Sequence, residues 1–200
     1  MIKPTDWDQT AAYTGAFDRL PPGYYVCKIV GARMEVSRSG REQFVLALDV
    51  SEGEHKGFFK SQYDSRKASG GGFSDQTKWP CTFYQGIKAN DGRTNGFFKG
   101  LISTIEESNP GYTFNWDERT LKDKAVGFVF GEEEFMGNDG NVRTNVKPAR
   151  FTSVEKARVG GSAPELRKLA NTPPQVLVGS AYYGSGGGST MPANEDDLPF

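Results

Sequence analysis

The chain has 200 residues, of which 36% are apolar and 12% aromatic, and its formal net charge is −1. This composition suits one compact domain with an additional segment, and no apolar run reaches the eighteen residues of a membrane-spanning helix. The polar N-terminus has no apolar signal region, so a cytoplasmic location is expected. Two cysteines and one histidine are too few for a disulfide framework or a zinc site, and we expect no metal and no cofactor.

The first half of the chain predicts three strands and a long loop. Residues 24–34 are rich in β-formers and residues 43–50 alternate apolar with polar side chains, so the two should form a hairpin. Residues 58–63 follow a polar turn and are expected to form a third strand. In residues 64–93 the apolar side chains follow neither the helical nor the strand period, which predicts a loop. Such a loop is long for a compact domain, and long loops are typically functional segments.

The second half predicts one helix and two further strands. Five apolar residues between positions 97 and 105 recur at helical spacing. Either Asn95 or Thr94 can cap the start and Asn109-Pro110-Gly111 is a stop signal, so we expect a helix over 95–108. Residues 125–130 and 143–154 are expected to be the fourth and fifth strands, because a turn-forming sequence lies between them.

This order of elements favours a mainly β fold, the five-stranded OB barrel, with one helix between strands three and four. The barrel should span residues 1–160, including loop 64–93. Residues 161–194 should hold a short helix at 164–170 and a flexible linker rich in glycine and serine, which leads to an acidic tip at 195–200. Six aromatic residues are assigned to packing, namely Tyr24, Phe44, Phe97, Phe98, Phe128 and Phe130.

The last six residues read Glu-Asp-Asp-Leu-Pro-Phe. Such a segment cannot fold alone, but its terminal ring can fill an apolar pocket while the carboxylates meet a basic rim. The string closely resembles the acidic tip of bacterial single-stranded DNA-binding proteins, where a disordered tail recruits replication and repair enzymes. The resemblance implies that partner proteins are bound by Asp196, Asp197, Leu198, Pro199 and Phe200.

The resemblance also implies a function, which is to coat and protect single-stranded DNA without sequence preference during replication, recombination and repair. No enzymatic activity is expected. The long connection with an embedded helix resembles the divergent versions carried by bacteriophages and other mobile elements, so the location would be a bacterial cell or a phage-infected host. The sequence leaves the oligomeric state, including a homo-oligomer, open.

The charge of the body is compatible with this function. Three of the 25 acidic residues lie in the tip and no basic residue follows Lys168, so the rest of the chain has an excess of two positive charges. Single strands are held by cations along the phosphates and aromatic rings under the bases. The residues of both kinds that fall where an OB barrel would use them are Arg38, Arg41, Phe58, Lys60, Tyr63, Arg66, Lys67, Lys78, Trp79, Tyr84, Lys88, Phe135, Arg143, Lys147 and Arg150.

Two other functions stay open on the sequence. One is an adaptor that binds proteins through an OB-like barrel without touching DNA. The other is a metal-dependent nuclease using residues 132–134, although adjacent carboxylates on a strand point to opposite faces and cannot converge on one ion. Trp79 is the aromatic residue most suited to base stacking, with anchoring of its own loop as the alternative.

Overall fold

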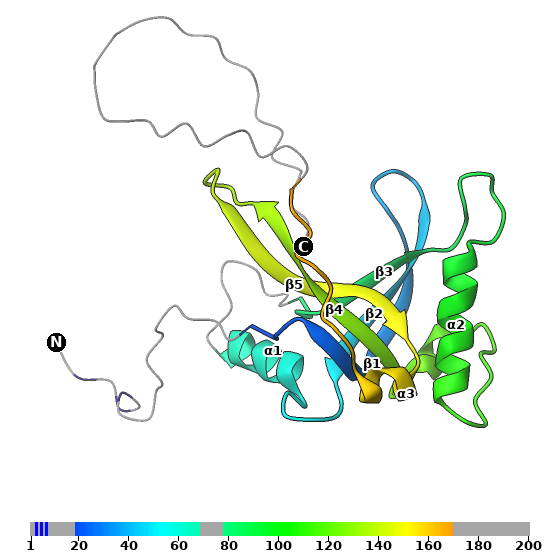
Figure 1. The fold of residues 1–200 in the computed structure, drawn as a ribbon, viewed down its shortest axis with the longest axis horizontal. Helices are drawn as coiled ribbons and strands as arrows, with labels where there is room; N and C mark the ends of the chain where they lie inside the picture. Colours follow the sequence, from blue (N-terminus) through cyan, green and yellow to red (C-terminus); the bar gives the residue numbers. More distant parts are fainter. Residues whose placement is uncertain (1–2, 4, 6, 8–18, 69–77, 170–200) are drawn as a thin grey trace, which may run out of the picture.

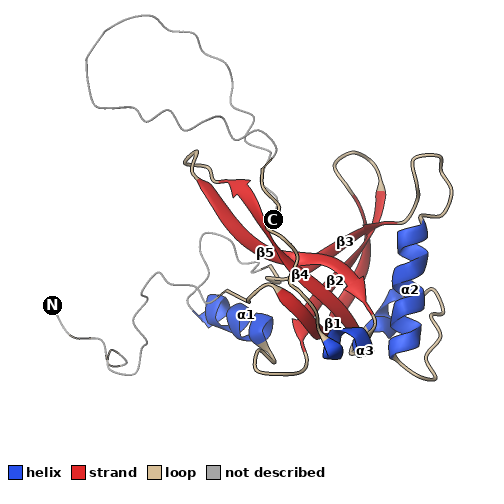
Figure 2. Ribbon diagram, in the orientation of Figure 1, coloured by secondary structure: helices blue, strands red, loops and turns tan. Residues whose placement is uncertain are grey.

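The computed structural model describes residues 3, 5, 7, 19–68 and 78–169. Within these residues the fold is mainly β, with a five-stranded antiparallel sheet in the order β3-β2-β1-β4-β5 and a few helices around it (Figures 1 and 2). The strands are β1 (Gly23–Val36), β2 (Glu42–Val50), β3 (Thr82–Gly86), β4 (Ala125–Met136) and β5 (Val142–Thr152). The helices are α1 (Phe58–Ala68), α2 (Gly96–Ser108), η1 (Glu118–Leu121) and α3 (Val154–Val159).

The sheet consists of two long hairpins, β1–β2 and β4–β5, and of β3 at one edge. The two hairpins are joined only by a short stretch of pairing between β1 and β4. β1 pairs with β4 between Gly23 opposite Phe130 and Lys28 opposite Ala125, and beyond these residues the hairpins diverge (Figure 1). β3 and β5 are the two edge strands and do not pair with each other. The expected five-stranded sheet and the predicted hairpins are therefore present, but the sheet is not closed, and the expected closed barrel is not confirmed.

The core lies on the concave side of the sheet and continues under α2. The N-terminal cap of this helix is Asn95, whose side chain accepts a hydrogen bond from the Phe97 amide, so the structure selects Asn95 over Thr94, the other cap that the sequence allowed. It buries Phe98, Leu101 and Ile105 against the sheet and contacts β3, β4 and β5. One packing prediction was wrong, because Phe97 lies on the outer side of α2 and is 72% exposed.

The predicted third strand at 58–63 was wrong, since these residues form the first part of α1. The true third strand, β3, lies inside the segment that we predicted to be a loop, and it pairs with β2 from Ala47 opposite Thr82 to Gln43 opposite Gly86. Local sequence favoured a strand because aromatic residues are common in strands. The helix forms instead because a residue outside it, Asp49 of β2, accepts hydrogen bonds from its first amides.

The predicted helix at 164–170 was also wrong within the residues that the structure describes. The chain after α3 runs in extended form beside β4, where Arg167 and Glu133 form an isolated parallel β-bridge through their backbones. The Arg167 amide donates to the Glu132 carbonyl at 2.9 Å, and the Glu134 amide donates to the Arg167 carbonyl at 2.9 Å. Residues 161–169 therefore cover the part of β4 that extends past the end of β1. The tip at 195–200 lies outside the described residues.

Candidate nucleic-acid interface

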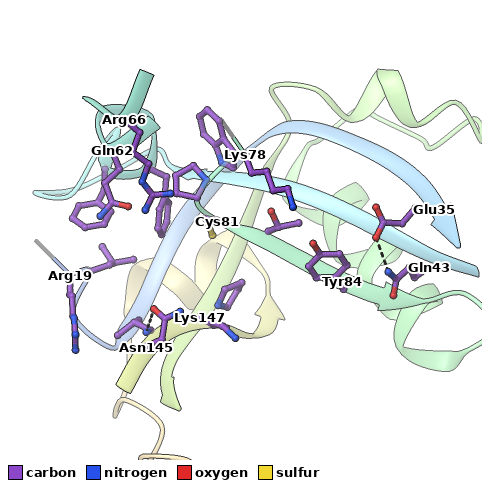
Figure 3. A pocket seen from close by; sticks show the side chains of 18 of the residues that line it. Arg19, Glu35, Gln43, Gln62, Arg66, Lys78, Cys81, Tyr84, Asn145 and Lys147 are labelled. Atoms are coloured by element: carbon purple, nitrogen blue, oxygen red, sulfur yellow. Dashed lines mark hydrogen bonds between the residues drawn. The ribbon is translucent and has the colours of Figure 1, made fainter. Parts of the chain in front are cut away.

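A groove of about 1010 Å³ lies where the two unpaired edges of the sheet face each other. α1 and the start of β3 form one wall, β5 forms the other, and the β1–β2 hairpin forms one end (Figure 3). Figure 3 shows Gln62 and Arg66 entering from α1, and Asn145 and Lys147 entering from β5. We call this the main groove, and its floor is partly apolar because Leu20, Phe58, Phe59 and Cys81 line it.

The main groove is strongly cationic. Among the residues that the structure describes, five basic side chains line it and one carboxylate, that of Glu35, does so. Glu35 is already engaged, because its Oε1 accepts from Gln43 Nε2 at 2.7 Å and its Oε2 lies 3.0 Å from the Arg33 guanidinium. The groove therefore presents a net positive field to an anionic polymer. The five cations are Arg19, Arg38, Arg66, Lys78 and Lys147, of which Lys147 pairs with Glu133 outside the groove.

The aromatic side chains of the groove differ in how freely they are presented. Trp79 Nε1 donates to the Leu48 carbonyl at 2.7 Å, and its ring centroid lies 5.1 Å from that of Tyr63. These contacts hold the Trp79 ring in place and anchor the segment that leads into β3. Anchoring of this segment is the role that was given as the alternative to base stacking. Tyr84 of β3 is 44% exposed and lies opposite Val45, so part of its ring is accessible for stacking on a base.

The position of α1 depends on a buried carboxylate. Asp49 is 1% exposed, and its Oδ1 accepts from the backbone amides of Phe59 at 3.1 Å and Lys60 at 3.3 Å. A carboxylate at a helix N-terminus satisfies amides that lack a partner within the helix and complements the helix dipole. Phe59 then stacks on Phe130, with ring centroids 5.8 Å apart, and Arg66, seven residues later on the same side of α1, lines the groove.

The structure brings about half of the predicted site residues together. Those lining the main groove are Arg38, Phe58, Arg66, Lys78, Trp79, Tyr84 and Lys147. The others lie outside it, and several are ion-paired, as Lys60 is with Asp64, Lys88 with Glu42 and Arg143 with Asp139. The remaining residues outside are Arg41, Tyr63, Lys67, Phe135 and Arg150.

The groove also contains residues that sequence reasoning missed. Arg19 was overlooked because it precedes the first strand, and its guanidinium donates to Thr144 Oγ1 of β5 at 3.1 Å. Gln62 was overlooked because a strand was expected where α1 lies. The signals that could have indicated the helix were Phe59 and Tyr63, four residues apart, and the basic residues Arg66 and Lys67 in the last turn.

The described residues hold no group of three or more His, Cys, Asp or Glu side chains that could bind a metal ion. Glu133 and Glu134 are used elsewhere, since the former pairs with Lys147 and the latter accepts from the Leu169 amide. Both cysteines are buried, and burial raises the pKa of the Cys27 and Cys81 thiols well above the ordinary range, which makes them poor nucleophiles. None of the helices in the described part of the chain has the length and apolarity needed to cross a bilayer.

The fold and site define a mainly β domain with an open five-stranded sheet and a cationic, partly aromatic groove along its gap. Residues 6–78 match a family described as a protein of unknown function (DUF669). This match includes β1, β2 and α1, and so the α1 wall of the main groove, but it covers less than half of the chain. No curated protein matches the chain.

Proposed function

We propose that this protein binds single-stranded DNA in the main groove, without sequence preference, during replication, recombination or repair. The observation that carries the proposal is that five cations and one engaged carboxylate are found among the described residues lining a groove that also exposes Tyr84. Cations neutralise phosphates, and an exposed ring supports any base, so this combination favours unpaired strands over duplex. The acidic tip would recruit partner proteins, as the resemblance implies.

The strand order supports an OB-type fold for this domain. Pairing of β3 with β5 would turn the order β3-β2-β1-β4-β5 into a closed ring, and α2 lies between strands three and four, as in that fold. We propose that the sheet is an OB-type barrel opened along this gap. Because of this opening, the binding face, which lies on β2 and β3 in a closed OB barrel, would also include β5.

The test is a titration of the full chain with fluorescein-labelled oligo-dT, followed by anisotropy at several salt concentrations. We expect binding whose logarithmic affinity falls with the logarithm of salt by roughly 0.7 for each neutralised phosphate. A double substitution of Arg66→Ala and Lys78→Ala removes two groove cations and should reduce this slope by about 1.4.

A matched control removes two exposed cations that do not line the groove, with Lys99→Ala and Lys122→Ala. The control should bind as the wild type does. Equal effects of the two double substitutions would show that binding is only a response to net charge, and absent or salt-independent binding would reject the proposed function. In the latter case an adaptor that binds only proteins becomes the better explanation.

A further inference from the structure

A second groove, of about 600 Å³, lies on the outer face of the sheet between β5 and α3. Among the described residues, the cations lining it are Arg150 and Lys156, and the one carboxylate is that of Glu155. Tyr24 of β1 and Val159, which is 87% exposed, add apolar surface to the same groove. The proposed function so far assigns no role to this groove.

The cations of the second groove are available to a ligand. The Arg150 guanidinium donates to the Tyr24 hydroxyl at 2.9 Å, an uncharged partner, and no carboxylate among the described residues forms an ion pair with Arg150 or Lys156. The hydrogen bond to Tyr24 orients the guanidinium without neutralising it. An oriented cation without an ion-pair partner, next to an aromatic ring, suits a nucleotide, because the cation can bind the phosphate and the ring can contact the base.

The second groove and the main groove are both lined by residues of β5. Side chains alternate along this strand, so that Arg143, Asn145 and Lys147 are exposed while the residues between them are partly buried. Lys147 lies opposite Gly131, the register shifts between Pro148 and Arg150, and this irregularity brings Arg150, opposite Val129, to the same outer face. Lys147 lines the main groove and Arg150 the second groove, and at ~3.3 Å per residue they are only ~10 Å apart along the strand.

We propose that the second groove is a continuation site for single-stranded nucleic acid, reached over Lys147 and used only by strands long enough to leave the main groove. Arg150 and Lys156 bind a phosphate there, and Tyr24 and Val159 contact the sugar or base. The proposal rests on the proposed function of the main groove. It adds a length dependence, because a short strand fills the main groove alone.

The experiment compares the wild type with a double substitution, Arg150→Ala and Lys156→Ala, across oligo-dT lengths from about 5 to about 20 nucleotides, which include the range of sites on single OB folds. For long oligomers the double substitution should weaken binding about fivefold and lower the salt slope by about 0.7, the value for one phosphate. For the shortest oligomers that bind, the affinity should equal that of the wild type. The Lys99→Ala and Lys122→Ala control should match the wild type at every length.

The outcomes separate the two proposals. If wild-type protein binds oligo-dT but the double substitution follows it at all lengths, the continuation site is wrong and the main groove stands. Equal weakening at every length also overturns the continuation site, because the second groove would then not be specific to long strands. If the wild type binds no oligomer, both proposals fail. A Tyr24→Phe substitution, which removes the hydroxyl partner of Arg150 and keeps the ring, should weaken only the binding of long oligomers.

Discussion

Substitution of Asp49 by alanine should destabilise the protein and disturb the α1 wall of the main groove. The substitution removes the acceptor of two amides at the start of α1, those of Phe59 and Lys60. Phe59 is buried, so water cannot readily replace the carboxylate. An unsatisfied buried donor costs ~1–3 kcal/mol, and the lost carboxylate at the helix N-terminus adds ~0.3–1 kcal/mol. Relief from burying a charge offsets part of this loss.

We therefore expect a net decrease of ~3 kcal/mol in the free energy of unfolding for Asp49→Ala. Asp49→Asn keeps an oxygen acceptor and should lose only ~1 kcal/mol. Equilibrium unfolding in urea measures both, and with a slope of ~2 kcal/mol/M the midpoint of the alanine variant should fall by ~1.5 M. Anisotropy with oligo-dT should also show weaker binding by Asp49→Ala, because Arg66 reaches the main groove from α1.

Asp64→Ala is the matched control. It removes an exposed carboxylate from α1, the helix whose first amides Asp49 accepts from, together with the ion pair to Lys60. Such exposed pairs contribute little, so this variant should stay within ~0.5 kcal/mol of the wild type. If Asp49→Ala were as stable as the control, or if Asp49→Asn were the less stable of the two variants, the explanation of why residues 58–68 form a helix would be refuted.

Three further predictions concern other parts of the chain. Asn109 joins α2 to β4 by donating to the carbonyls of Ile105 and Ala125 and accepting from the Ala125 amide, so Asn109→Ala should lose ~2–3 kcal/mol in urea unfolding; a loss under ~0.5 kcal/mol would contradict this. The raised pKa values of Cys27 and Cys81 mean that the folded state holds the thiol protons more tightly than the unfolded state, so this stability is present below the ordinary thiol pKa and is lost as the pH rises above it. Both thiols should resist a disulfide reagent at pH 8 until the protein unfolds, and rapid labelling of the native protein would show that they are not buried. Deletion of residues 195–200 should tighten oligo-dT binding at low salt if the acidic tip competes with phosphates for the main groove, whereas unchanged or weaker affinity would count against that competition.

The sequence predicted those elements whose signals are local. The β1–β2 hairpin follows from the alternation around Phe44 and Leu46, and α2 follows from its helical period and from Asn95 as its N-terminal cap. α1 could not be predicted in this way, because its N-terminal acceptor, Asp49, lies on another element. β3 has only five residues, and its pairing with β2 becomes evident only when both strands are in place.

The main groove was predicted only in part, because only some of its residues lie in segments with a local sequence signal. Arg38 and Lys147 were found because hairpins are recognisable in a sequence, Arg38 lying in the turn of the first and Lys147 on the second strand of the last, and both line the groove. Arg19 and Gln62 were missed because their contribution depends on tertiary packing of segments without a clear pattern. The gap between β3 and β5, which creates the groove, is a property of strand pairing over long separations and has no local signature.

The extended segment beside β4 has a practical consequence for any shortened form of this protein. On the side of β4 that β1 leaves uncovered, residues 132–134 find their backbone partner in Arg167. A protein cut at residue 160 would expose this strand margin, and exposed margins recruit strands from other molecules. Truncation after residue 169 should give monodisperse material by light scattering, whereas truncation at residue 160 should give self-associating material.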